Sequence, residues 1–267
     1  MGPVLNANIL ENEMFDEWKG KRVLITGASR GIGAAVARQL GALGARVAVH
    51  YHASAGPAET VAQAVRDAGG EAFTLQGDVS RSSEAQRLVD EAAERLGGLD
   101  LLINNAGDML GRVALGDMDD EQYDRVMDLN ARSVVMASRA ALPHFRRAGR
   151  GNIIHTTSIA ARNGGGPGAG LYASAKGFVS TLTHSMAKEL AGEGIRVNGV
   201  APGTIATDFH ERHSNEAQLT AARASIPMGR LGSAEECVGA YVFLGTDTMS
   251  GYVTGQVIEV NGGQLMP

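Results

Sequence analysis

Short apolar runs alternate with longer segments of helical residue spacing along nearly the whole chain of 267 residues. Seven runs, each bounded by Gly, Asp or Asn, are expected to be strands: Arg22–Thr26, Arg46–His50, Ala72–Gln76, Leu101–Asn104, Asn152–Thr157, Arg196–Ala201 and Val257–Val260. The segments between them, rich in Ala, Leu, Glu, Arg and Gln, are expected to be helices: Gly31–Leu43, Pro57–Ala68, Ser82–Leu96, Asp119–Ala148, Tyr172–Ala191 and Ala234–Leu244. Such alternation predicts an α/β fold with a doubly wound parallel sheet of seven strands and helices on both faces.

The length is compatible with a single domain, because α/β folds of roughly 200–250 residues often form one unit. Residues 1–18 precede the first expected strand and are interpreted as an N-terminal extension, and residues 19–267 as the domain. The N-terminal residues have neither a basic region nor a long apolar region, and no apolar run is long enough to cross a bilayer. A cytoplasmic protein without a membrane partner is therefore expected.

Charge and cysteine content argue against several classes of protein. The net charge is −5, and the basic residues are scattered, so nucleic acid is not an expected partner. Cys237 is the single cysteine; it excludes an intrachain disulfide and is interpreted as a small core residue. His210 and His213 are expected on a solvated surface and His155 in a structural role, so no metal site is predicted.

Gly27, Gly31 and Gly33 follow the first apolar run directly and open the first helical segment. The amides and the positive dipole end of that helix can then face a phosphate group. A glycine-rich turn between a strand and a helix predicts a dinucleotide site.

Tyr172 and Lys176 lie four residues apart on an expected helix, so their Cβ atoms are about 5–6 Å apart on one face. The ammonium is expected to lower the pKa of the phenol, which makes the pair a candidate acid/base. Ser158 ends an apolar strand and can donate a hydrogen bond to an oxygen on which charge develops.

The glycine spacing and this pair resemble the short-chain dehydrogenase/reductase family in its compact form, from about Lys21 to Gly263. The further matches are Gly77-Asp78-Val79, Asn104-Asn105-Ala106-Gly107, Asn130 on the long fourth helix, and Pro202-Gly203-Thr204-Ile205 with Thr207. The resemblance implies a Rossmann-type, single dinucleotide-binding catalytic domain with Asn130, Ser158, Tyr172 and Lys176 as catalytic residues. It also implies that Lys176 binds the nicotinamide ribose and that Asn130 holds a water of a proton relay. A homotetramer formed through the fourth and fifth helices and the C-terminal segment is implied as well.

The cofactor is expected to be NADP rather than NAD. An acid at the end of the second strand would accept the ribose hydroxyl of NAD, but the stretch from His50 to Ser54 contains none. Arg30 in the glycine turn supplies donors suited to a phosphate. The expected cofactor-binding residues are Gly27, Ser29, Arg30, Gly31, Ile32, Gly33, Tyr51, His52, Ser54, Asp78, Val79, Asn105, Ala106, Gly107, Tyr172, Lys176, Pro202, Gly203, Thr204, Ile205 and Thr207.

Two stretches after expected strands, Ala160–Gly170 and Gly203–Met228, lack clear regularity and are candidate substrate loops. Ser158 and Tyr172 enclose thirteen residues, one more than is common in the family, which leaves the substrate contacts open. The expected reaction moves hydride between NADP(H) and the carbonyl or secondary alcohol of a small substrate.

A 3-oxoacyl thioester reductase and a sugar or polyol dehydrogenase share these motifs, and both stay open. Carrier-protein docking would use basic residues such as Arg132, Arg139, Arg162 and Arg230 near the entrance. A non-catalytic dinucleotide-binding regulator is a remote alternative. Such a protein is expected to lack one or more of the four catalytic residues, whereas this sequence contains all four. Nucleotide-sugar epimerases and dehydratases use a different glycine spacing.

Overall fold

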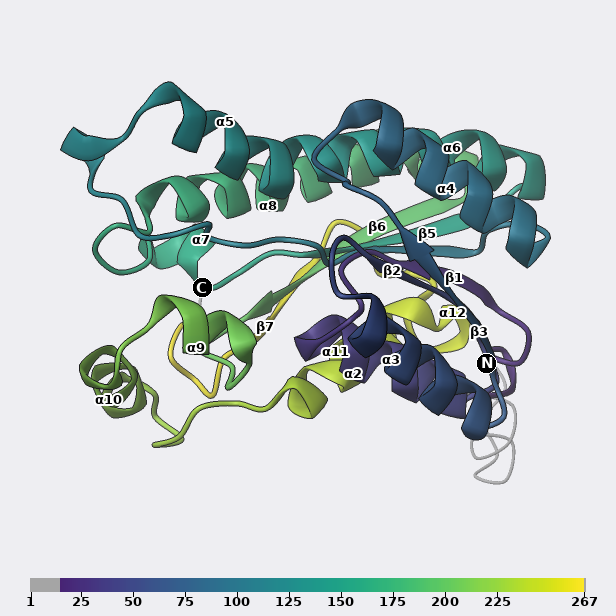
Figure 1. Ribbon diagram of the computed structural model, residues 1–267. Coiled ribbons are helices and arrows are strands. Elements are labelled where there is room, and N and C mark those ends of the chain that lie inside the picture. Colours follow the sequence, from purple (N-terminus) through teal and green to yellow (C-terminus); the bar gives the residue numbers. More distant parts are fainter. Residues whose placement is uncertain (1–14, 267) are drawn as a thin grey trace, which may run out of the picture.

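The computed structural model describes residues 15–266, in which seven strands form one parallel sheet of order β3-β2-β1-β4-β5-β6-β7 (Figure 1). The strands are β1 (Arg22–Ile25), β2 (Arg46–Tyr51), β3 (Glu71–Gln76), β4 (Leu101–Asn104), β5 (Gly151–Thr156), β6 (Ile195–Pro202) and β7 (Val257–Val260). The fold class and all seven strands predicted from the sequence are confirmed. The strand order reverses between β1 and β4, and ligands of open α/β sheets bind at such a point.

Helices cover both faces of the sheet (Figure 1). One layer contains α2 (Gly31–Ala42), α3 (Ala55–Asp67), α11 (Ala234–Gly245) and the short α12 (Asp247–Ser250). The other contains α4 (Ser82–Leu96), α5 (Asp120–Met127), α6 (Ser133–Ala148) and α8 (Gly170–Leu190). Side chains alternate along each strand, so Val23 and Ile25 enter the first hydrophobic cluster and Leu24 enters the second. No helix of these described residues is long and apolar enough to cross a membrane.

The helices begin and end where local chemistry favours it. Ser233 starts α11 with a capping box in which its side chain and that of Glu236 bond reciprocally to the backbone. Gly97 and Gly149 end α4 and α6 in the left-handed conformation, which glycine adopts without a Cβ penalty.

The single helix predicted over Asp119–Ala148 is wrong. The segment forms α5, a π-helical turn over Asp128–Arg132, and α6. Within the turn, the Asn130 side chain donates to the carbonyl of Val126 at 2.9 Å, the acceptor that a backbone N–H would use in an uninterrupted α-helix. Such π turns inside helices occur frequently at functional sites.

The two candidate substrate loops contain short helices that sequence spacing does not reveal. These are α7 (Ala160–Asn163), α9 (Asp208–His213) and α10 (Glu216–Ser225). Two single helical turns lie elsewhere in the chain, at Leu115–Asp117 and Ala191–Glu193. Asn215 starts α10 with a capping box. Both loops are therefore ordered by short helices, and they follow the carboxyl ends of β5 and β6.

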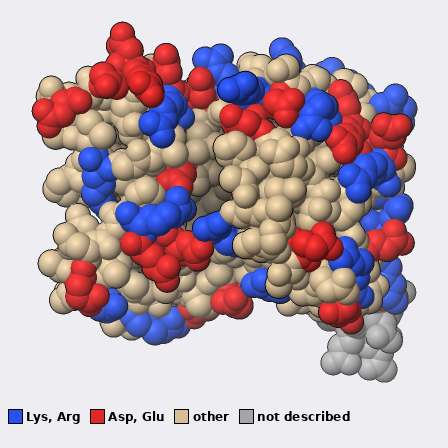
Figure 2. Space-filling view, in the orientation of Figure 1, with Lys and Arg blue, Asp and Glu red and all other residues tan. Residues whose placement is uncertain are grey.

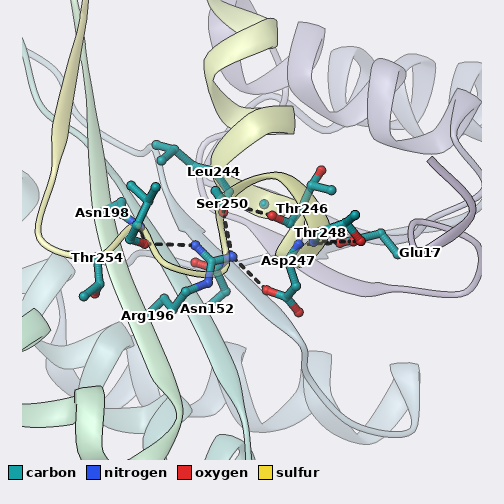
Figure 3. Close-up of polar contacts among 12 residues, drawn as sticks. Glu17, Asn152, Arg196, Asn198, Leu244, Thr246, Asp247, Thr248, Ser250 and Thr254 are labelled. Carbon is teal, nitrogen blue, oxygen red and sulfur yellow. Dashed lines mark hydrogen bonds and ion pairs between the residues drawn. The ribbon is translucent and has the colours of Figure 1, made fainter. Parts of the chain in front are cut away.

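The described part of the predicted N-terminal extension, residues 15–18, belongs partly to the domain. Trp18 is completely buried, and its indole N–H donates to Thr246 Oγ1 at 3.0 Å. The Glu17 carboxylate accepts hydrogen bonds from the backbone N–H groups of Asp247 and Thr248, at 2.7 and 2.9 Å (Figure 3). Glu17 and Trp18 thus contact the domain, and residues 1–14 lie outside the described residues.

We expect Trp18→Ala to lower the free energy of unfolding by about 3–5 kcal/mol, because it removes a large buried side chain and leaves a cavity. Phe15→Ala is the matched control, since Phe15 is 41% exposed and its truncation should change stability little. Urea unfolding at one protein concentration measures both. Equal losses for the two variants would contradict the packing role of Trp18.

Candidate active site

A cavity of about 770 Å³ opens at the carboxyl ends of the strands, where β1, β4, β5 and β6 lead into their loops. Twenty of the residues predicted for the site line it: Gly27, Ser29, Arg30, Gly31, Ile32, His52, Ser54, Asp78, Val79, Asn105, Ala106, Gly107, Ser158, Tyr172, Lys176, Pro202, Gly203, Thr204, Ile205 and Thr207. Figure 2 shows a hollow on this side of the molecule with acidic and basic side chains interspersed around it. One continuous cavity thus joins the glycine turn to the predicted catalytic residues.

The glycine turn packs closely against the end of β4. Gly27 has φ +64°, and a Cβ built on it would lie 2.8 Å from the Cα of Ala106. A Cβ on Gly33 would lie 2.5 Å from Asn105 Nδ2. Gly33 does not line the cavity; it lets α2 approach β4, so its role is in packing.

The N-terminus of α2 fits an anionic ligand. Arg30 is the N-cap residue and makes no capping side-chain hydrogen bond, so the first amides of the helix stay available to a pyrophosphate. Asn105 Nδ2 donates to the carbonyls of Thr26 and Gly27, each at 3.0 Å, and keeps the turn in place. The residues present therefore fit a dinucleotide cofactor.

Basic and polar side chains from the glycine turn and from the end of β2 line the cavity. Arg30 contacts Asp208 at 3.1 Å and bonds to the hydroxyl of Ser54. His50 was not predicted as a site residue. It lines the cavity, and its Nδ1 accepts a hydrogen bond from the Gly27 N–H at 3.0 Å. Tyr51 lies at the end of β2 and packs partly against the hydrophobic cluster, so it is not among the cavity residues.

Burial lowers the pKa of His50 to about 4, so the ring is neutral near pH 7. Its Nε2 lies 3.1 Å from the Gly77 carbonyl and donates to it, which leaves Nδ1 as the acceptor for Gly27. The histidine therefore connects the glycine turn to the end of β3. An alignment of related sequences could have found it, whereas its position inside an apolar strand gave no signal.

The predicted catalytic residues converge from β5 and α8. Ser158 follows β5, and Tyr172 and Lys176 lie on the first turns of α8. Lys176 Nζ donates to the Thr156 carbonyl at 2.9 Å and lies 5.8 Å from the centroid of the Tyr172 ring. Gly107 separates Lys176 from Asn130, since a Cβ there would lie 2.9 and 2.8 Å from their polar atoms.

Asn130 is completely buried behind the cavity and does not line it. Its Nδ2 donates to the Asp108 carbonyl at 2.7 Å, and its Oδ1 accepts from the Asp108 N–H at 3.2 Å. The asparagine thus fixes the segment after β4 and lies beside the lysine.

The expected lowering of the Tyr172 pKa by Lys176 is not found in this structure. Burial raises the pKa of the phenol to about 12, although the Ser158 hydroxyl partly offsets the rise. Burial also lowers the pKa of Lys176 to about 8. No attraction from Lys176 offsets the effect of burial on the phenol, and the lysine Nζ donates to the Thr156 carbonyl.

The histidine pair on α9 was predicted on a solvated surface, and that prediction is wrong. His210 lines the cavity, and His213 bonds to Asp108 with its side chain only 10% exposed. Helix α9 folds over the catalytic residues, with the rings of Phe209 and Tyr172 5.5 Å apart. Within residues 15–266, no three His, Cys, Asp or Glu side chains group as metal ligands.

Two other side chains have the structural positions expected of them. Buried His155 lies with Nδ1 2.9 Å from Thr183 Oγ1, and burial lowers its pKa to about 3. Cys237 is buried on α11, and burial raises its pKa to about 12, so it stays a thiol.

Comparison with known proteins agrees with this geometry. A family model described as enoyl-(acyl carrier protein) reductase matches residues 27–264. A 3-oxoacyl-(acyl-carrier-protein) reductase of Synechocystis is 39% identical over 243 residues, which cover 91% of this chain and 96% of that relative. The chain belongs to the short-chain dehydrogenase/reductase family.

Solved structures of this family share the fold closely. An NADH-dependent reductase responsible for alginate metabolism superposes with a TM-score of 0.87 at 43% identity, covering 94% of this chain and 100% of that one. A short-chain dehydrogenase of Burkholderia cenocepacia in complex with NADP has a TM-score of 0.86 at 34% identity, covering 92% and 98% of the two chains. The protein is therefore an oxidoreductase of the NAD(P)-binding, Rossmann type.

We expect Tyr172→Phe to reduce turnover by about 10²–10⁴-fold, the range for loss of a general acid, because the phenol is the predicted proton donor. The dissociation constant of the cofactor should stay nearly unchanged. Tyr123→Phe is the matched control, since Tyr123 is 49% exposed on α5. Steady-state kinetics measures turnover, and a fluorescence titration measures the dissociation constant of the cofactor. Unchanged turnover in Tyr172→Phe would contradict a catalytic role for the phenol.

We expect kcat/KM for carbonyl reduction to fall above about pH 8, where Lys176 loses its proton while the phenol remains protonated. The ammonium is present below that pH and absent above it, so the slope should correspond to one proton. Lys188→Met, which removes an exposed lysine of the same helix, should keep the profile. A rate that stays flat up to pH 10 would contradict a role for the Lys176 charge.

Proposed function

We propose that the protein is an NADP(H)-dependent reductase of small carbonyl compounds, which also oxidises the corresponding secondary alcohols. The observation that carries the proposal is the single cavity that joins the glycine turn to Ser158, Tyr172 and Lys176. The nicotinamide, when bound, supplies or accepts the hydride. The neutral Tyr172 phenol donates a proton to the substrate oxygen, and Ser158 donates a hydrogen bond to it.

Lys176 and Asn130 complete a path for the proton. Gly107 has no side chain, which leaves the space between the two polar groups free. The lysine can resupply a proton to the phenol, and a water held by Asn130 can resupply the lysine. Asn130 is thus a positioning residue in this proposal.

The preference for NADP is supported by charge. No carboxylate follows β2, whereas Arg30, His52 and Ser54 line the cavity there. A guanidinium suits a ribose phosphate, and a cofactor phosphate could replace Asp208 as the partner of Arg30. Family neighbours use both cofactors: one is solved with NADP, and the alginate-metabolism reductase is solved with NAD.

We expect Arg30→Ala to lower kcat/KM for NADPH by about 10- to 100-fold and to change the value for NADH little, because a charge-assisted hydrogen bond contributes about 1.5–3 kcal/mol. Arg38→Ala, an exposed change on the same helix and outside the cavity, should leave the ratio unchanged. An unaltered NADPH to NADH ratio in Arg30→Ala would reject the assignment.

Two substrate classes have support. The Synechocystis relative is named a 3-oxoacyl-(acyl-carrier-protein) reductase, which favours a 3-oxoacyl thioester. The arginines proposed for carrier docking are mostly engaged, since Arg132 and Arg230 each lie 2.6 Å from a carboxylate. Arg162 lies 3.9 Å from Glu259. These pairs and the reductase of alginate metabolism favour a small polar carbonyl compound.

Initial rates with acetoacetyl thioester, aldoses and polyols, each with both cofactors, separate the two classes. Turnover of the thioester alone supports the acyl class, and turnover of a sugar or polyol alone supports the polar class. Absence of cofactor oxidation or reduction with every compound would contradict the proposed activity.

A homotetramer is also proposed. The described helices α5 and α8 expose Tyr123 and Phe178, which are 49% and 45% accessible in one chain. Large exposed apolar side chains on neighbouring helices are suited to an interface. Light scattering should give four times the mass of the chain, and a monomeric mass would reject the assembly.

A further inference from the structure

One guanidinium in the catalytic cavity has no carboxylate partner. Arg112 lies after β4 and lines the cavity. Its Nε donates to the His213 carbonyl at 2.7 Å, and its Nη1 donates to the Pro167 carbonyl at 2.9 Å. Both acceptors are neutral, and no ion pair of Arg112 occurs among residues 15–266.

The other arginines of the cavity are neutralised. Arg30 pairs with Asp208, and Arg212 pairs with Asp108. Asp78, the remaining acidic residue of the lining, lies 3.6 Å from Arg81. Apart from the catalytic Lys176, the unbalanced charge of the lining is therefore that of Arg112, in a protein whose net charge is −5.

Arg112 lies where the two candidate substrate loops border the cavity. Its two acceptors belong to the loop before α8 and to α9, which are the two candidate substrate loops. The ring of Phe209, on α9, lies 5.5 Å from that of Tyr172 and 5.0 Å from that of His213. Arg112 and Tyr172 thus both border α9, Arg112 through the His213 carbonyl and Tyr172 through the Phe209 ring.

The cavity lining offers further polar atoms. His210 Nδ1 lies 3.0 Å from Ser214 Oγ, which leaves Nε2 for other partners. Gln264 also lines the cavity; its Nε2 donates to Ser225 at 2.8 Å, while its buried Oε1 has no partner within the described chain. An unpaired acceptor and an unpaired cation are suited to a substrate that carries both hydroxyl and anionic groups.

We propose that Arg112 binds a carboxylate of the substrate and so makes the enzyme selective for oxo acids. This inference rests on the proposed carbonyl reduction and specifies its substrate class. The free edge of the guanidinium can bind a planar carboxylate through charge-assisted hydrogen bonds. The phosphate of a carrier-bound thioester is the other possible anion, but it lies at the end of a long arm, far from the reacting carbonyl.

The test uses two pairs of probes that differ in the carboxylate: acetoacetate with methyl acetoacetate, and glucuronate with glucose. Calorimetry on the full chain saturated with NADP⁺ gives dissociation constants, and kinetics with NADPH gives kcat/KM. In Arg112→Gln we expect about 10- to 100-fold weaker binding of the acids, the usual range for a charge-assisted hydrogen bond, and less than about threefold change for the neutral partners.

The controls separate recognition from a purely structural role. Arg112→Lys keeps the charge and should retain part of the selectivity, whereas Arg38→Gln removes an exposed arginine outside the cavity and should retain all of it. An equal loss of affinity for acids and neutral compounds in Arg112→Gln would show that the residue only connects the two loops through its hydrogen bonds. That result would overturn the proposal. An affinity for acetoacetyl-coenzyme A that depends on Arg112, with none for the small acids, would assign the site to a phosphate and also overturn it.

Failure of the proposed function gives a different result. If no probe is turned over with either cofactor while the acids still bind through Arg112, the anion site stands and carbonyl reduction is rejected. If the neutral probes are reduced and Arg112→Gln leaves the acids unaffected, the reductase stands and the anion site is rejected.

Discussion

The structure of the site depends on the close approach between the glycine turn and the end of β4. Glycine at position 27 brings the turn against Ala106, where a methyl group on Gly27 would lie 2.8 Å from a backbone atom. Thr26 Oγ1 accepts from the backbone N–H groups of Asn105 and Ala106, each at 3.0 Å. These contacts join the two strands between which the sheet order reverses, so the glycine turn and the end of β4 border the cavity together.

Burial determines the chemistry of the catalytic pair more than mutual attraction does. Tyr172 and Lys176 share a helix face as their spacing predicts, yet the phenol has a raised pKa and the ammonium a lowered one. Each shift favours the neutral form, because the protein packed around the two groups removes water from them. A half-buried neutral phenol beside a lysine that can lose its proton is suited to donating a proton to a carbonyl oxygen.

The sheet could be predicted from the sequence because its central strands are apolar runs buried on both faces, as Leu101–Asn104 shows. The cofactor turn could be predicted because Gly27 and Gly33 are required by local geometry. The π turn could not, since it depends on Asn130 bonding to Asp108 from another segment. His50 and α9 were missed for the same reason: their positions follow from packing across the cavity and not from local spacing. Trp18 lacked a strand or helix pattern of its own.

The hydrogen bond between Trp18 and Thr246 spans 228 positions of the chain. During synthesis, the indole is therefore made long before its partner, and the hydrophobic layer around α2 and α11 stays incomplete until almost the whole chain has left the ribosome. Long-range pairings of this kind slow folding, because the entropy of closing the loop must be lost before the contact forms. A protein shortened before α11 would lack Gly245 and Thr246, which pack against and bond to the Trp18 ring, and would leave that ring without these partners.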